Sequence, residues 1–221
     1  MCGRYNLYTG KEELAERFLI ANAENLDIEE NYNIAPGQPI FTVLSDGARR
    51  LGGYVKWGLV PSWAKNPKIG YKMINARAET VDVKPSFSRL LKRRRCLIAA
   101  DGFYEWRKMG HEKQPYLIRL KTGKPFGFAG LWDKWTDGTR LMYSCTIITA
   151  AANSLMEEIH DRMPVILTEE TEAIWLNKSI QEPVILKNLL APYPAGEMEA
   201  FPVSKEVNSP SGKGPEMLNS L

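Results

Sequence analysis

Short apolar segments of strand character recur along the chain, and this pattern constrains the fold most. Turn residues such as Ser45-Asp46-Gly47 separate them, as in hairpins. Many short strands with few helices predict an α+β fold, with a twisted antiparallel, barrel-like β-sheet core and peripheral helices. The expected strands lie at 2–8, 40–44, 51–60, 96–100, 103–107, 116–120, 126–132, 143–149 and 164–167.

The expected helices are short and begin at capping residues. Thr9 and Ser154 are each followed by a glutamate three residues later, which is the capping-box pattern. Thr168 is expected to cap a helix that runs through residue 175. Further helices are expected at 87–91 and 183–190.

Nothing in the sequence divides the chain of 221 residues into separate domains. We therefore expect one domain over residues 2–207. Residues 208–221 contain Ser, Gly and Pro but few bulky apolar groups, which predicts a flexible tail.

Composition places few limits on function. The formal net charge of +3 permits nucleic-acid binding without demanding it. The three cysteines, at 2, 96 and 145, form no CxxC pair, so we expect neither a disulfide scaffold nor a metal site. No apolar run approaches the ~20 residues of a transmembrane helix. We expect a cytoplasmic monomer, associated with the nucleoid if the host is a bacterium.

A cysteine directly after the initiator methionine is an unusual feature. If Met1 is removed, Cys2 carries an α-amine and a thiol, which titrate near ~8 and ~8.5. Gly3 leaves room for a substrate, and Arg4 suits a phosphate or carboxylate. The alternative is an unremarkable residue on a frayed terminus.

Glu105 and His160 are the next candidates. Glu105 lies in an otherwise aromatic strand, and an apolar environment would raise its carboxyl pKa toward neutrality. Its alternative is a solvated sheet face. His160 precedes Asp161 and Arg162 at an expected loop, where functional residues concentrate. A lone histidine is more often structural.

Two weaker signals concern polar and aromatic side chains. Asn75, Arg77 and Glu79 alternate, so a strand would place all three on one face. Trp63 lies near basic residues, where an indole can stack on a nucleobase, although most tryptophans belong to the core.

Six motifs occur in an order that resembles the SRAP family, the SOS-response-associated peptidases or abasic-site-processing proteins. The resemblance runs from Cys2 to about Val207 and is far more specific than any single motif. The motifs are Met1-Cys2-Gly3-Arg4, Asn33-Ile34-Ala35-Pro36-Gly37, Trp57-Gly58-Leu59-Val60-Pro61, Ile74-Asn75-Ala76-Arg77-Ala78-Glu79-Thr80, Asp101-Gly102-Phe103-Tyr104-Glu105-Trp106 and His160-Asp161-Arg162-Met163-Pro164.

The resemblance implies a sensor of abasic sites in single-stranded DNA that needs no cofactor. Such a protein removes its own Met1, and Cys2 then traps the sugar aldehyde as a thiazolidine. An imine intermediate would also support a strand-cleaving lyase activity. By similarity, Asn75 positions the Cys2 amine, Glu105 transfers protons, and His160 assists ring opening or proton transfer near a phosphate.

The resemblance also implies which residues hold DNA. Trp63 would stack at a kinked strand, but Ala64 and Lys65 follow it, so a second adjacent aromatic is missing. The residues expected to contact phosphates are Arg4, Arg77, Arg162 and, more weakly, Thr149.

Two alternative functions are also compatible with the sequence. Met-Cys-Gly also opens the N-terminal-nucleophile glutamine amidotransferases, in which the processed cysteine attacks an amide. A non-enzymatic module that binds single-stranded DNA is the third alternative. The later motifs argue against the amidotransferase.

Overall fold

A five-stranded β-barrel forms the centre of the protein. We describe residues 2–209, 212 and 214–221 from a computed structural model. The barrel strands are β3 (Pro39–Ser45), β4 (Arg50–Trp57), β6 (Arg95–Ala100), β9 (Phe126–Thr136) and β10 (Leu141–Ala151). The barrel closes because β10 pairs with β4 on one side and with β9 on the other.

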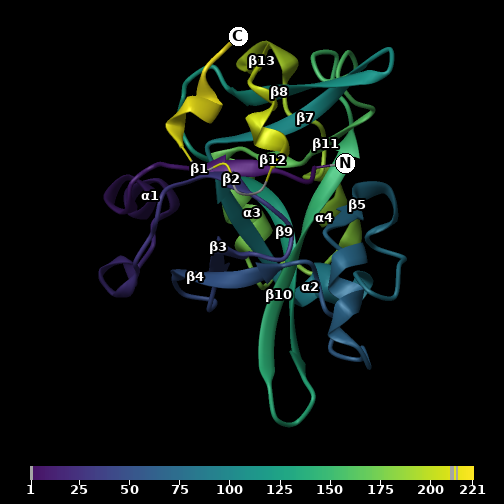
Figure 1. Cartoon of the computed structure of the whole chain (residues 1–221). Helices are drawn as coiled ribbons and strands as arrows, with labels where there is room; N and C mark the ends of the chain where they lie inside the picture. Colours follow the sequence, from purple (N-terminus) through teal and green to yellow (C-terminus); the bar gives the residue numbers. More distant parts are fainter. Residues whose placement is uncertain (1, 210–211, 213) are drawn as a thin grey trace.

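Three short strands extend the barrel sheet, and a second sheet packs beside it. The strands that attach to the barrel are β5 (Asn75–Arg77), β11 (Arg162–Pro164) and β12 (Ile166–Leu167). The second sheet lies toward the top of Figure 1, in the order β13-β8-β7-β1-β2. Its strands are β1 (Tyr5–Leu7), β2 (Asn31–Ile34), β7 (Gly102–Met109), β8 (Glu112–Leu120) and β13 (Met198–Pro202).

The expected α+β class, with a barrel-like sheet and peripheral helices, is confirmed. Its sheets are not wholly antiparallel, because β10 runs parallel to both β4 and β5. The stretch 58–74 leads from β4 to β5, and the two strands pair with successive parts of β10, at 144–145 and at 147–149. This route brings Asn75 and Arg77 alongside the middle of β10.

In the described residues, four α-helices lie around the sheets. Thr168 caps its helix as expected, because its hydroxyl accepts a hydrogen bond from the Thr171 amide at 3.3 Å. The helices are α1 (Lys11–Phe18), α2 (Ser88–Arg93), α3 (Glu169–Leu176) and α4 (Pro183–Asn188), with short 3-10 helices at Ala23–Asn25, Pro67–Lys72, Ala78–Thr80, Ala195–Glu197, Lys205–Asn208 and Pro215–Leu218.

Both capping-box predictions are wrong. Gly10, not Thr9, is the N-cap of α1, because the Thr9 hydroxyl donates to the Asp101 carboxylate at 2.5 Å. Residues 154–159 form turns, and the amide of Met156 is bonded by the Asn153 side chain at 3.0 Å. In both places a polar partner that the capping pattern does not include takes the hydrogen bond.

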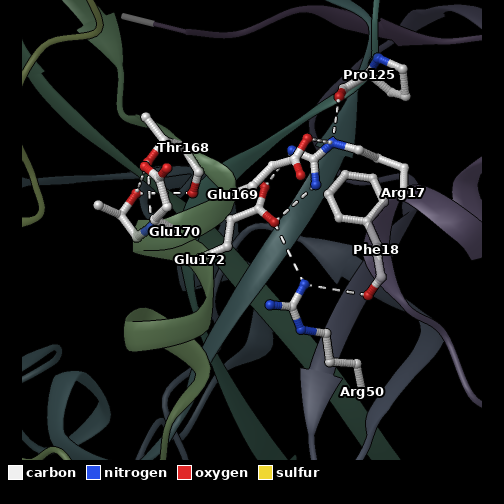
Figure 2. Close-up of polar contacts among 9 residues, drawn as sticks. Arg17, Phe18, Arg50, Pro125, Thr168, Glu169, Glu170 and Glu172 are labelled. Carbon is white, nitrogen blue, oxygen red and sulfur yellow. Dashed lines mark hydrogen bonds and ion pairs between the residues drawn. The ribbon is translucent and has the colours of Figure 1, made fainter.

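A buried ion pair ties α1 to α3. Both carboxylate oxygens of Glu172, whose side chain is fully buried, accept hydrogen bonds from Arg17 at 2.8 and 3.0 Å. Arg50 of β4 lies 3.6 Å from the same carboxylate. Figure 2 shows both arginines pointing toward Glu172. Burial raises the pKa of the Glu172 carboxyl, and Arg17 opposes that shift.

The described part of the expected tail packs against the second sheet. Met217 is 1% exposed, and the Leu221 amide donates to the Pro202 carbonyl at 3.0 Å. Residues 210, 211 and 213 lie outside the described residues, and the flexibility of 208–221 stays a prediction. Within the described ranges, no helix is long and apolar enough to cross a membrane.

Candidate functional site

The first described residues lie between the two sheets. Cys2 is fully buried, and the strand that follows it, β1, pairs Tyr5 with Phe103 of β7. The Cys2 carbonyl accepts a hydrogen bond from the Asn75 side chain at 2.8 Å. Asn75 belongs to β5, which attaches to the barrel. This hydrogen bond therefore connects Cys2 to the barrel sheet.

Glu105 of β7 is 2% exposed, so the solvated-face alternative is wrong. Burial raises the pKa of its carboxyl, and a protonated His160 would oppose that shift. Burial also raises the pKa of the Cys2 thiol, and the negative charge of Glu105 raises it further. These mutual effects place Cys2, Glu105 and His160 in one electrostatic environment.

His160 lies in the loop before β11, and its Nδ1 has two polar neighbours. It is 3.0 Å from the Arg162 amide nitrogen and 2.9 Å from the Asp161 carboxylate. A neutral Nδ1 accepts from the amide, whereas a protonated Nδ1 donates to the carboxylate.

Glu105 and His160 share an open pocket of about 400 Å³. The other walls come from the β7–β8 hairpin and from the segment after β13. Those further lining residues are Trp106, Lys108, Lys113 and Asn208. A site of this kind admits a solvent-exposed substrate to a buried acid and a histidine.

Arg77, Thr149 and Arg162 lie on three adjoining strands. Thr149 of β10 is the register partner of Arg77, and the Arg162 guanidinium donates to the Thr149 carbonyl at 2.6 Å. Arg162 also forms a bidentate pair with Glu79, at 2.6 and 3.0 Å. The strand ends at Arg77, so the expected single face for Asn75, Arg77 and Glu79 is wrong.

Arg4 and Trp63, also expected to contact DNA, lie outside the pocket of Glu105 and His160. Arg4 donates to the Asn33 side chain and to the Val207 carbonyl, both at 2.8 Å. Trp63 is 60% exposed and borders a separate hollow of about 340 Å³ that also includes Lys65 and Lys68. Neither residue lines the pocket of Glu105 and His160.

The predictions from sequence did not include three residues of the pocket wall, Lys108, Lys113 and Asn208. Lys108 and Lys113 follow the expected strand 103–107 and were expected in a loop. In the structure they belong to β7 and β8, which pair up to the hairpin turn. Asn208 stood in the expected tail, yet it accepts a hydrogen bond from the Trp106 indole at 2.7 Å. Continuing the strand alternation beyond residue 107 would have found the lysines; no local signal marks Asn208.

The pocket is thus lined by a buried carboxylate and a histidine, and the buried Cys2 lies within the electrostatic range of that carboxylate. The chain belongs to the SRAP family: the model for SOS response associated peptidase matches residues 1–210.

Named relatives cover the whole length of the chain. It is 49% identical to the abasic site processing protein YoqW of Bacillus subtilis, over all of both chains. It is 32% identical to the abasic site processing protein HMCES of Xenopus tropicalis, over 87% of this chain and 67% of that protein. A crystal structure of a protein from Bacteroides thetaiotaomicron superposes with a TM-score of 0.89 at 28% identity, covering both chains fully.

Proposed function

We propose that this protein processes abasic sites in single-stranded DNA by forming a covalent bond through Cys2. The observation that carries the proposal is the placement of Cys2. It is buried, held through its carbonyl by Asn75, and within electrostatic range of Glu105, which shares a pocket with His160. Family membership and the names of the relatives support the substrate class.

The reaction begins with removal of Met1. Water cleaves the Met1–Cys2 peptide bond, which releases methionine and turns the Cys2 amide nitrogen into an amine. That amine adds to the ring-opened aldehyde of the abasic sugar and expels water, which gives an imine. The thiol sulfur then bonds to the imine carbon while its proton moves to nitrogen, closing a five-membered thiazolidine.

Glu105 supplies the proton transfers in this scheme. A carboxyl whose pKa is raised by burial can protonate the departing hydroxyl as water leaves, and the carboxylate can take a proton from the attacking amine. The same exchange serves the reverse reaction. His160, across the pocket, assists opening of the sugar ring or carries a proton beside a phosphate.

Asn75 orients the nucleophile. Its hydrogen bond to the Cys2 carbonyl restrains the Cys2 Cα, which carries the amine, and the adjacent Cβ, which carries the thiol. Arg77 of the same strand, with Thr149 and Arg162 of the adjoining strands β10 and β11, holds the flanking phosphates, while Trp63 stacks farther along the DNA strand.

The imine also accounts for a lyase activity. It acidifies the sugar proton next to the imine carbon, and loss of that proton lets the 3′ phosphate leave. Closure of the thiazolidine ring competes with this elimination, because it consumes the imine.

Mass spectrometry of the purified protein tests the proposal. The intact mass should lack Met1, and mixing with an abasic oligonucleotide should add the mass of the oligonucleotide minus one water. Cys2→Ser should bind the oligonucleotide yet yield no heat-stable adduct, because a hydroxyl is a far weaker nucleophile than a thiol. Equal adduct yield from Cys2→Ala would contradict the role of Cys2.

Incubation with glutamine separates this function from the amidotransferase alternative. We expect no release of ammonia from the wild-type protein. Steady ammonia release that disappears in Cys2→Ala would favour the alternative instead.

A further inference from the structure

Two lysines face each other at the rim of the pocket. Lys108 of β7 and Lys113 of β8 are register partners in the hairpin, and both are exposed. Like charges directly opposite each other on an antiparallel pair destabilise it. The hairpin therefore carries an unfavourable arrangement at the edge of the candidate site.

The neighbouring acid does not relieve this repulsion. Glu112, next to Lys113 in the chain, pairs with Lys205 at 2.7 Å. Among the residues that the structure describes, no ion pair includes Lys108 or Lys113. The two ammonium groups thus remain available to an anion from solution.

The wall beside the lysines is firmly attached. The indole of Trp106 donates to Asn208, and the preceding residue, Val207, is fully buried with its carbonyl held by Arg4. Val207 packs with Tyr104 in a small second core. Both lysines lie in paired strands and line the same pocket as Glu105 and His160.

We propose that Lys108 and Lys113 together bind one backbone phosphate of the DNA strand, next to the abasic sugar. This inference rests on the proposed function and adds a phosphate contact outside the group of Arg77, Thr149 and Arg162. A bound phosphate removes the lysine–lysine repulsion and releases condensed counterions. It also fixes the sugar relative to Glu105 and His160.

Binding to an unreactive oligonucleotide tests the inference. The probe is single-stranded DNA with one tetrahydrofuran residue, which mimics the abasic sugar but has no aldehyde. We expect Lys108→Gln/Lys113→Gln to bind about tenfold more weakly than wild type. Its slope of log K against log salt should be smaller by ~0.7, the value for one phosphate on a single strand.

Lys124→Gln/Lys178→Gln is the matched control. It removes the same charge from positions outside the pocket, in the segment between β8 and β9 and in the segment between α3 and α4. We expect it to retain the wild-type slope. If both double variants lose the same affinity and slope, the lysine pair has no specific role and the inference is overturned.

Replacing single phosphates by neutral methylphosphonates locates the contact. Wild type should lose affinity most at one linkage beside the tetrahydrofuran residue, and Lys108→Gln/Lys113→Gln should lose nothing further there. Equal losses in the two proteins at every linkage would also overturn the inference.

The two proposals can fail separately. Adduct formation by wild type on a true abasic oligonucleotide tests the proposed function, whereas the tetrahydrofuran probe tests the phosphate contact without any covalent step. An adduct together with an unchanged slope in Lys108→Gln/Lys113→Gln would refute the lysine contact alone.

Discussion

Burial of Glu105 changes the properties of the residues around it. A carboxylate that loses water without a full set of compensating charges holds its proton more strongly, and its negative form disfavours a second anion nearby. Burial and the negative charge of Glu105 both raise the pKa of the Cys2 thiol, which disfavours its thiolate form. We infer that the amine made by Met1 removal, rather than a thiolate, attacks the sugar first.

Glu105→Gln should slow both formation and reversal of the adduct, because the amide cannot exchange a proton. Rates measured on denaturing gels with an abasic oligonucleotide check this expectation. Asn208→Ala, which alters the pocket wall without removing an acid, should retain the pH profile of wild type. Unchanged rates in Glu105→Gln would remove this carboxyl from the mechanism.

Glu105 should also make stability depend on pH. The folded chain keeps the Glu105 proton above the ordinary carboxyl pKa, where the unfolded chain has lost it. The free energy of unfolding of wild type should therefore fall as pH rises through the interval between the two values. In urea denaturation, Glu105→Gln should gain stability relative to wild type from pH 4 to pH 8. A constant difference would contradict the raised pKa.

At the scale of single elements, the ion pair between α1 and α3 stabilises the packing of two helices, and its residues do not line the pocket of Glu105 and His160. Arg17→Met leaves the buried Glu172 with Arg50 alone, at 3.6 Å. Breaking a buried pair costs about 3 kcal/mol because one charge remains unpaired. Urea denaturation should show this loss, and Arg49→Met, at an exposed pair with Asp46, should show none.

The double variant Arg17→Met/Glu172→Met separates charge from packing. Since it removes the buried carboxylate together with Arg17, and Arg50 keeps its hydrogen bond to the Phe18 carbonyl, it should recover most of the stability that Arg17→Met loses. A double variant that is less stable than Arg17→Met would show that packing, not the unpaired carboxylate, determines the loss.

At the scale of the whole molecule, the end of the chain packs onto the sheet that holds Glu105. Met217 is almost fully buried, so Met217→Ala should lower the free energy of unfolding by ~2 kcal/mol. Met109→Ala, at a side chain that is 59% exposed, is the control and should change little. If the two variants unfold alike, 208–221 behaves as the flexible tail that its composition predicts.

Local patterns predicted much of the molecule. Alternation and turn residues predicted the β3–β4 and β7–β8 hairpins, and Thr168 predicted the start of α3. These features depend on residues close in the chain, so a single sequence contains the necessary information. The capping predictions at Thr9 and Ser154 failed where Asp101 and Asn153 competed for the same hydrogen bonds.

The sequence by itself determined the α+β class and the family, and it supplied the candidate site residues. Only the tertiary structure decided that Asn75 bonds to Cys2, that Glu105 is buried, and that Asn208 forms a pocket wall. The reason is physical: burial and hydrogen bonding between distant residues depend on how the two sheets pack. Local propensity carries no information about that packing.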